Sequence, residues 1–297
     1  MFNRVRNKKT WAKKQILVLL LLITAVIIMI VVFNRPDIRF IMENTWNQIC
    51  VSAKLEKINF NKDSLQSISI DDIKNGKTDI VYNNTLCLVN NEYPIGEDLQ
   101  FNLVNYRDTA VLMDESLVES YAQLSADVKK HVGDNLFVMS HYRSEEEQQN
   151  LYKEDKKTAA LPGASEHQTG LALDVYVRNY AGSGFLKSEV GQFINKQCWK
   201  YGFIIRYPLL KKHVTGIRFE PWHIRYVGLP HSEIIYKEGL TLEEYIGSLE
   251  VGIFYKFNNY YISRQNTDTL LFPDHLKDIV ISPDNTGCYI ITGRTNE

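Results

Sequence analysis

Residues 165–177 read SEHQTGLALDVYV, and the second half of this stretch has the pattern of a strand. Residues 171–177 alternate large aliphatic side chains with smaller or polar ones, which is the period-two pattern of a half-buried strand. Asp174 then lies on the face opposite the larger aliphatic residues. Gly170 can adopt backbone conformations that other residues avoid, so the chain can turn just before the strand. The stretch therefore predicts a turn and a strand that bring His167 near Asp174.

The sequence on either side alternates between helical and strand periodicity. Asp114 can cap a helix that ends at Gly133, and Ser144 with Glu147 forms a capping box that starts a second helix. Further helices are expected at 188–201, near 232 and near 241, and strands at 86–89, 136–139, 203–207 and 217–227. This order of elements predicts an α+β domain over residues 81–248.

The segments that flank this domain have a different character. Residues 36–58 can be helical, because a proline suits the first turn of a helix, whereas residues 59–79 are polar and weakly periodic. We therefore expect a stalk or linker over residues 35–80. Residues 249–297 contain short β-rich runs separated by Asn, Asp, Pro and Gly, which predicts a small β-rich appendage at the C-terminus.

The N-terminal region has the features of a membrane anchor. Positions 1–14 hold six basic residues and no acidic one, and residues 16–33, ILVLLLLITAVIIMIVVF, carry no charge. Such a run covers most of a hydrocarbon core of about 30 Å, and no small-x-small cleavage site follows it. Because only Arg35 is basic just after the run, the N-terminus is expected in the cytoplasm. We expect a basic tail at 1–14, a single transmembrane anchor at 15–34, and everything after it outside the cell.

Charge and cysteine content exclude other classes of protein. The formal net charge is −1, and removing the six N-terminal basic residues leaves −7 on the remainder. An acidic remainder argues against nucleic acid as a partner, because phosphate binding needs a basic face. The cysteines form no CxxC motif and their pairing does not follow from the sequence; they are Cys50, Cys87, Cys198 and Cys288.

Two segments contain the residues of a hydrolytic metal site. They are residues 165–174 and residues 220–223, the second reading EPWH. Catalytic zinc is usually held by three protein ligands drawn from histidine and carboxylate, with a fourth position left open. His167, Asp174 and His223 provide such a set. Taken singly, each is more often a solvated, capping or core residue, so the residues alone leave both interpretations open.

Glu220 is the candidate general base of this site. A carboxylate near bound zinc can take the proton of an attacking water and pass it to the departing amine. The spacing from Glu220 to His223 would put the two side chains on opposite faces of a flat strand. Pro221 lies between them and favours a bend or bulge. We expect that bend to bring both side chains to one site.

Several segments together resemble the M15 zinc peptidases, specifically the VanY-type D-alanyl-D-alanine carboxypeptidases. They are NNEYPI, SHYRSEEEQ, LPGASEHQTGLALDV, KYGFIIRYP and FEPWHIRYVGLPHS, in the family's order. They cover most of residues 86–248, whereas the tail after residue 250 is similar only loosely. The resemblance implies the D-Ala-D-Ala metallopeptidase (hedgehog/DD-peptidase-like) fold with Zn²⁺ as cofactor. A membrane anchor suits this family, because some members are tethered outside the cell.

The resemblance also implies a role for each residue of the metal site. His167, Asp174 and His223 correspond to the family's zinc ligands, and Glu220 corresponds to its catalytic base. Arg143 corresponds to the arginine that polarises the scissile carbonyl and stabilises the oxyanion, a role suited to a fixed guanidinium.

Four further positions correspond to residues around the family's substrate: Gln148, Ser165, Tyr207 and Trp222. For Tyr207 and Trp222 the alternative is plain packing in the core. One departure from the family is visible, since members commonly read Ser-Gly-Tyr-Arg where this chain has Ser140-His141-Tyr142-Arg143. His141 is bulkier than glycine and can alter the local backbone.

The implied activity is removal of the C-terminal D-Ala from peptidoglycan precursor peptides that end in D-Ala-D-Ala. The family name alone suggests a link to glycopeptide resistance. An L,D-carboxypeptidase that trims tetrapeptides would use the same catalytic residues, whereas a dipeptidase would need a closed pocket that nothing in the sequence indicates. A non-catalytic, zinc-stabilised cell-wall-binding module would need neither Glu220 nor Arg143. Serine-type carboxypeptidase chemistry is excluded because no SxxK motif with a matching KTG occurs.

Overall fold

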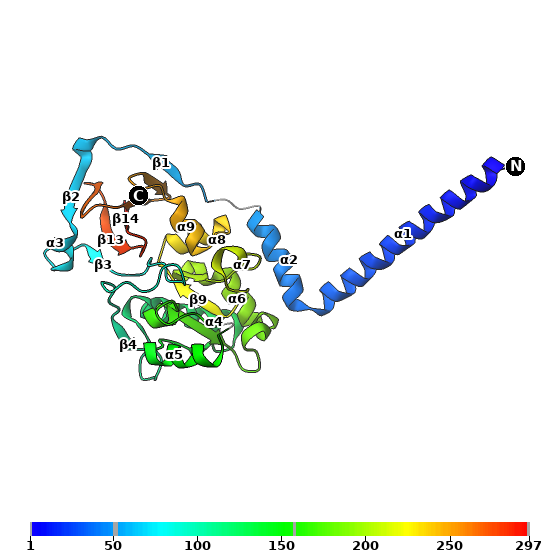
Figure 1. Cartoon of the computed structure of the whole chain (residues 1–297), viewed down its shortest axis with the longest axis horizontal. Coiled ribbons are helices and arrows are strands. Elements are labelled where there is room, and N and C mark those ends of the chain that lie inside the picture. Colours follow the sequence, from blue (N-terminus) through cyan, green and yellow to red (C-terminus); the bar gives the residue numbers. More distant parts are fainter. Residues whose placement is uncertain (1, 50–52, 157–158, 296–297) are drawn as a thin grey trace. The chain divides into compact units, whose positions relative to one another are not determined.

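A computed structural model of the chain describes residues 2–49, 53–156 and 159–295 (Figure 1). Cys50 lies outside these residues. The chain divides into two units, Met1–Asn47 and Gln48–Glu297.

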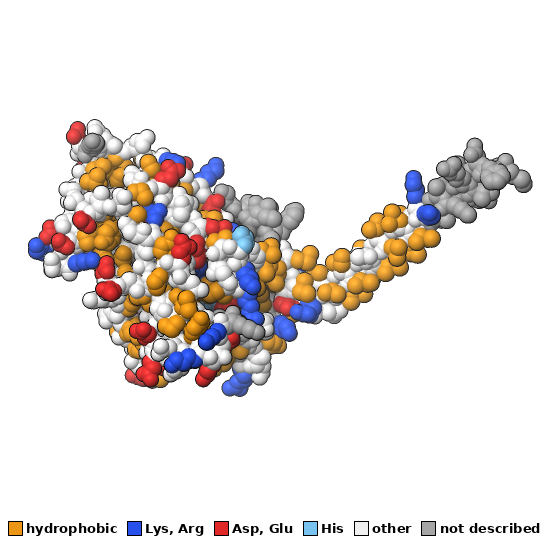
Figure 2. Space-filling model, in the orientation of Figure 1, with side chains coloured by type: hydrophobic (Ala, Val, Ile, Leu, Met, Phe, Trp, Pro, Cys, Tyr) orange, Lys and Arg blue, Asp and Glu red, His pale blue; other side chains and the backbone are white. Residues whose placement is uncertain are grey.

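The N-terminal unit is helical. Helix α1 (Phe2–Asn34) contains a 22-residue segment, Lys13–Asn34, that is long and apolar enough to cross a membrane; an 18-residue window within it has a mean hydropathy of 3.6 and no buried residue. Figure 2 shows hydrophobic side chains along the visible face of this segment. Helix α2 (Pro36–Ile49) begins at the expected proline. The helix expected over residues 36–58 is wrong at its end, because Glu56–Ile58 forms strand β1.

A four-stranded antiparallel sheet forms the centre of the second unit. Its order is β6 (Phe137–Ser140), β7 (Ala172–Tyr176), β9 (His223–Tyr226) and β8 (Phe203–Ile205). The register pairs Asp174 of β7 with His223 of β9 on one side and with Ser140 of β6 on the other. The predicted strand at residues 171–177 is therefore confirmed, and it lies in the middle of the sheet.

Three helices of this unit follow the predicted signals. A 3₁₀ turn (Glu115–Leu117) capped by Asp114 leads into α4 (Val118–Val132), which ends at left-handed Gly133. Helix α5 (Glu145–Glu154) has the predicted capping box, and α6 (Glu189–Gln197) runs into a 3₁₀ segment that ends before Gly202. The apolar residues of α4, α6 and the strands form one core, which includes Leu124, Val128, Leu173, Val175, Ile194 and Phe203.

Two strand predictions differ from the structure. Residues 217–222 are not part of a strand, because β9 begins only at His223. Leu86–Val89 is a buried segment without strand pairing: Leu86 N–H donates to Ser282 Oγ (2.9 Å) and Leu88 N–H donates to the Asp284 carbonyl (3.0 Å). A continuous apolar run indicates burial, but it does not specify which groups complete the hydrogen bonds.

A second sheet joins segments from the two ends of this unit. It has six strands in the order β1, β10 (Phe254–Phe257), β11 (Tyr260–Gln265), β14 (Tyr289–Arg294), β13 (Lys277–Pro283) and β3 (Val81–Tyr82). Strand β12 (Thr269–Pro273) pairs separately with β2 (Leu65–Ser69). The β-rich character expected after residue 249 is confirmed.

The stalk expected over residues 35–80 is wrong where β1 and β2 pair with these C-terminal strands. Both strands are short and carry polar residues, and their partners lie about two hundred residues away, so no local pattern reveals the pairing. The exact boundaries of a peptidase domain at residues 81–248 stay a prediction.

The remaining elements are short. They are α3 (Ile70–Lys74), β4 (Leu103–Asn105), β5 (Leu112–Asp114), α7 (Lys212–Thr215), α8 (His231–Glu238) and α9 (Leu242–Ser248), with 3₁₀ segments at Lys62–Ser64, Glu166–Thr169, Gly182–Lys187 and Cys198–Tyr201. Helices α8 and α9 confirm the helices expected near residues 232 and 241, and Thr241 caps α9 through a capping box.

Candidate active site

His167, Asp174 and His223 meet at one end of the central sheet. His223 Nδ1 lies 3.0 Å from Asp174 Oδ1, and His167 Nε2 lies 3.4 Å from Asp174 Oδ2. One ligand atom from each residue lies within 4.8 Å of the others. Zinc bonds of about 2.0–2.2 Å in a tetrahedral arrangement place ligand atoms roughly 3.3–3.6 Å apart. The donor set and its spacing therefore fit a tetrahedral zinc ion with one position left for water or substrate.

The turn before β7 depends on Gly170. Its φ of +71° lies in the left-handed region. A Cβ at this position would lie 2.6 Å from Leu103 Cδ2 and 2.8 Å from the Asp114 backbone nitrogen. The expected need for glycine here is thus both conformational and steric, and the turn places His167 beside Asp174.

The second ring nitrogen of each histidine lies near an oxygen atom. His167 Nδ1 lies 3.0 Å from the His141 carbonyl oxygen, a contact that requires N–H at this nitrogen and leaves Nε2 as the lone-pair donor. His223 Nε2 lies 3.7 Å from Glu166 Oε2, which leaves Nδ1 facing Asp174. His141, the departure from the family pattern, therefore contributes a backbone acceptor. Its ring accepts a hydrogen bond from Leu112 N–H (3.4 Å).

Glu220 reaches the same site through a tight turn. His223 N–H donates to the Glu220 carbonyl (3.1 Å), and Glu220 N–H donates to the Tyr207 carbonyl (3.0 Å). The chain thus folds back over Pro221 instead of continuing as a strand, so the spacing no longer separates the two side chains. Glu220 and His223 line one cavity of about 180 Å³.

That cavity collects eight of the nine site residues expected from the sequence. Its walls include Arg143, Gln148, Ser165, His167, Asp174, Tyr207, Glu220 and His223. Among the described residues, Trp222 is not part of the lining; it is half-buried and packs against the core. The position of Trp222 thus agrees with packing in the core, which was the alternative to substrate contact for this residue.

Arg143 is held in place by neighbours on the rim of the cavity. Its Nη1 donates to Gln148 Oε1 (2.6 Å) and its Nη2 donates to Ser140 Oγ (3.0 Å). Gln148 is fully buried and its Nε2 donates to the Ala160 carbonyl (2.7 Å). Gln148 therefore fixes the guanidinium as well as lining the cavity, and burial lowers the pKa of Arg143.

The environment separates the protonation states of the site. Burial raises the pKa of Glu220, although nearby His223 offsets part of the effect. Burial alone would raise the pKa of Asp174, but its contacts with His167 and His223 hold that pKa well below the usual range. Burial lowers the pKa of His167 and keeps the ring neutral. The Asp174 carboxylate thus stays ionised and is suited to bind a cation, whereas the Glu220 carboxylate is better suited to exchange a proton.

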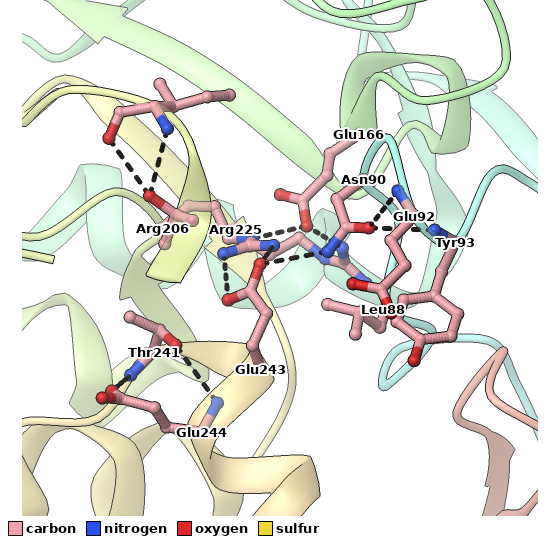
Figure 3. Close-up of polar contacts among 12 residues, drawn as sticks. Leu88, Asn90, Glu92, Tyr93, Glu166, Arg206, Arg225, Thr241, Glu243 and Glu244 are labelled. Carbon is pink, nitrogen blue, oxygen red and sulfur yellow. Dashed lines mark hydrogen bonds and ion pairs between the residues drawn. The ribbon is translucent and has the colours of Figure 1, made fainter. Parts of the chain in front are cut away.

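A buried charge network that was not predicted from the sequence lies behind this site. Glu166 lies between Arg206 and Arg225, and Arg206 also contacts Glu243 (Figure 3). Burial alone would raise the pKa of Glu166, but the two arginines hold it well below the usual range. One signal was available, since each arginine interrupts an otherwise apolar strand segment, FIIRYP and HIRYV. Charged residues at such positions are rarely buried without partners.

The chain is similar in sequence to known proteins. The sequence model described as VanY, D-alanyl-D-alanine carboxypeptidase, matches residues 110–229. A D-alanyl-D-alanine carboxypeptidase from Enterococcus faecium is 37% identical over 237 residues, covering 71% of this chain and 76% of the relative. The bifunctional D-Ala-D-Ala dipeptidase and carboxypeptidase VanXYC from Enterococcus gallinarum is 36% identical over 181 residues, covering 54% of this chain and 93% of the relative.

A solved structure extends the similarity to the fold. The vancomycin resistance D,D-dipeptidase VanXYg, in complex with a D-Ala-D-Ala phosphinate analogue, matches with a TM-score of 0.62 and 27% identity. The match covers 77% of this chain and 98% of that chain. The mixed α/β architecture described above is thus similar to that of the VanX and VanY peptidases. The chain belongs to the VanY family of D-alanyl-D-alanine carboxypeptidases.

Proposed function

We propose that this chain is a zinc-dependent D,D-carboxypeptidase that removes the C-terminal D-Ala from peptidoglycan precursor peptides. The convergence of three metal-binding side chains, Glu220 and Arg143 on one cavity carries this proposal. Family membership supports it, since the curated relatives are named for this activity. A structure in the family is named for vancomycin resistance, so we propose a role in glycopeptide resistance for this chain as well.

His167, Asp174 and His223 would hold the zinc ion. Two imidazoles and one carboxylate form a donor set typical of catalytic zinc. When bound, zinc supplies Lewis acidity that makes a water molecule and a peptide carbonyl more reactive.

Glu220 and Arg143 perform the proton transfer and charge stabilisation. Glu220 takes a proton from the attacking water and delivers it to the nitrogen of the departing D-Ala, a double role that its raised pKa favours. Arg143, fixed by Gln148 and Ser140, stabilises the oxyanion that develops on the scissile carbonyl. Ser165 and Tyr207 line the same cavity and contact the peptide.

Two alternatives share much of this geometry. An L,D-carboxypeptidase acting on tetrapeptides would use the same zinc, base and arginine. A zinc-stabilised binding module would keep the metal residues but would need no Glu220 in the cavity. D-Ala release from a pentapeptide ending in D-Ala-D-Ala and from the matching tetrapeptide, with and without a chelator, separates the three. The proposal predicts chelator-sensitive release from the pentapeptide in preference to the tetrapeptide.

We also propose that residues 15–34 anchor the enzyme in the cell membrane, with the N-terminus cytoplasmic and the catalytic unit facing the cell wall. The length and apolarity of α1 support a membrane span, and the six basic residues before it support this orientation. Protease added to intact cells should degrade the catalytic unit and leave the N-terminal tail protected. A main product that lacks residues 1–35 would instead indicate a cleaved signal.

A further inference from the structure

The carboxylate of Glu166 connects a metal-site histidine to two buried arginines. Its Oε1 accepts hydrogen bonds from Arg206 Nε and Arg225 Nη1, both at 2.7 Å. Its Oε2 lies 3.7 Å from His223 Nε2. Neither Oε2 nor this nitrogen has a hydrogen bond to another group among the described residues, although both atoms are buried. Glu166 Oε2 and His223 Nε2 are thus the polar partners available to one another.

The two arginines are themselves fixed by distant parts of the chain (Figure 3). Arg206 donates to both oxygens of Glu243 on α9, at 2.9 and 2.6 Å. Arg225 Nη2 donates to the carbonyls of Thr85 and Cys87, at 3.0 and 2.9 Å. Because the two cations are matched by two carboxylates, the buried group is neutral as a whole, and its geometry leaves Glu166 little freedom to rotate.

A fixed carboxylate next to an imidazole nitrogen favours N–H at that nitrogen. With the proton of His223 on Nε2, the lone pair is on Nδ1, which faces Asp174 at 3.0 Å. We infer that Glu166 is a positioning residue for metal binding: held by Arg206 and Arg225, it orients His223 and selects the tautomer that presents Nδ1 to zinc. This inference rests on the proposed role of His223 as a metal ligand.

A purely structural role for the network makes a different prediction. Glu166 and Glu243 each provide a carboxylate to the same buried guanidinium, but only Glu166 faces His223. Glu243→Gln is therefore the control at Arg206, since this variant and Glu166→Gln each remove one negative charge next to that guanidinium at nearly constant shape; Glu166→Gln also removes the charge next to Arg225, which Glu166→Asp retains. If the network only supports the fold, both variants should show the same defect. If Glu166 orients His223, altered metal binding should appear only in Glu166→Gln.

The test measures metal binding by the full chain in detergent. Zinc affinity comes from competition with a chelator, and the visible absorption spectrum of the Co²⁺-substituted protein reports ligand geometry. We expect Glu166→Gln to weaken zinc binding 10- to 100-fold and to change the Co²⁺ spectrum, the range seen when groups that orient metal ligands are replaced. Glu243→Gln should retain the wild-type spectrum and an affinity within about threefold of wild type.

Further variants distinguish the ways in which this inference can fail. If His223→Ala loses zinc while Glu166→Gln binds it as tightly as wild type, the positioning role is wrong and the ligand set stands. If His223→Ala keeps wild-type affinity, the proposed ligand set itself is wrong. Should Glu166→Gln not fold, Glu166→Asp carries the same test, because it keeps the charge for both arginines and withdraws it from His223. Wild-type zinc affinity in that variant would overturn the inference.

Discussion

At the scale of single residues, side chains of the same type have different roles in and around the site. Asp174 and Glu220 line one cavity, yet the pKa of the first is lowered by two histidines and the pKa of the second is raised by burial. Arg143 opens onto that cavity, whereas Arg206 and Arg225 are buried behind it. These different roles follow from the atoms that surround each side chain, and they cannot be deduced from the residue type alone.

Arg143→Ala should reduce kcat by about 10²- to 10³-fold, because removal of one oxyanion-stabilising donor typically has an effect of this size. Zinc content should stay at the wild-type level, since Arg143 is not part of the metal-binding set. Arg178→Ala, at an exposed arginine outside the cavity, is the control and should leave kcat unchanged. Equal activities of the two variants would show that Arg143 does not stabilise the transition state.

At the scale of elements, helix boundaries and the central strand could be predicted because their signals are local. Asp114, Gly133 and the capping box at Ser144 each act within one turn of the chain. Strands β1 and β2 could not be predicted, because their pairing depends on strands at the other end of the chain. The network around Glu166 could not be predicted for the same reason, since the partners of Glu166 and its arginines come from four separate segments of the chain.

The turn before β7 gives a test at this scale. Gly170→Ala should destabilise the fold by roughly 2–4 kcal/mol, because a left-handed backbone and a close contact with the Asp114 backbone act together. Gly133→Ala is the matched control: its φ is also positive, at +83°, but a Cβ there would meet nothing within 4 Å. That control should cost only about 1–2 kcal/mol. Unfolding of the two variants in urea measures the difference, and equal losses would contradict the steric argument.

At the scale of the whole second unit, the C-terminal strands are integrated with the segment that precedes the peptidase region. Strands β1, β2 and β3 all pair with strands beyond residue 250. The buried segment at residues 86–89 is also held by Ser282 and Asp284. A chain that ends at Ser248 should therefore lose folded protein and zinc content together. A truncated chain that folds and binds zinc like wild type would restore the interpretation of residues 249–297 as a separate appendage.

The buried side chain of His231 should make the stability of this unit depend on pH. His231 Nδ1 contacts Tyr245 Oη (2.6 Å) and its Nε2 contacts Thr292 Oγ1 (2.9 Å), and burial lowers its pKa from 6.5 to about 3. Between those values the unfolded chain binds a proton that the folded chain does not. Stability should therefore decrease as pH falls below 6.5, by at most about 1.4 kcal/mol per pH unit.

Urea unfolding between pH 5.5 and 6.5 tests this dependence above the range in which carboxyl groups of the unfolded chain, with ordinary pKa values of about 4, bind protons. His231→Gln should flatten the slope, whereas His213→Gln, at an exposed position, should leave it as in wild type. A slope that His231→Gln does not change would show that another group controls the acid sensitivity.

The central claim is that Glu220 transfers the proton in a zinc-dependent removal of D-Ala. Its most direct test measures D-Ala release from a pentapeptide ending in D-Ala-D-Ala, with zinc content, for wild type, Glu220→Gln and the exposed control Glu119→Gln. The account predicts that Glu220→Gln keeps its zinc and loses at least 10²- to 10⁴-fold in turnover, while the control matches wild type. A Glu220→Gln enzyme that retains most of its activity at full zinc content would contradict it.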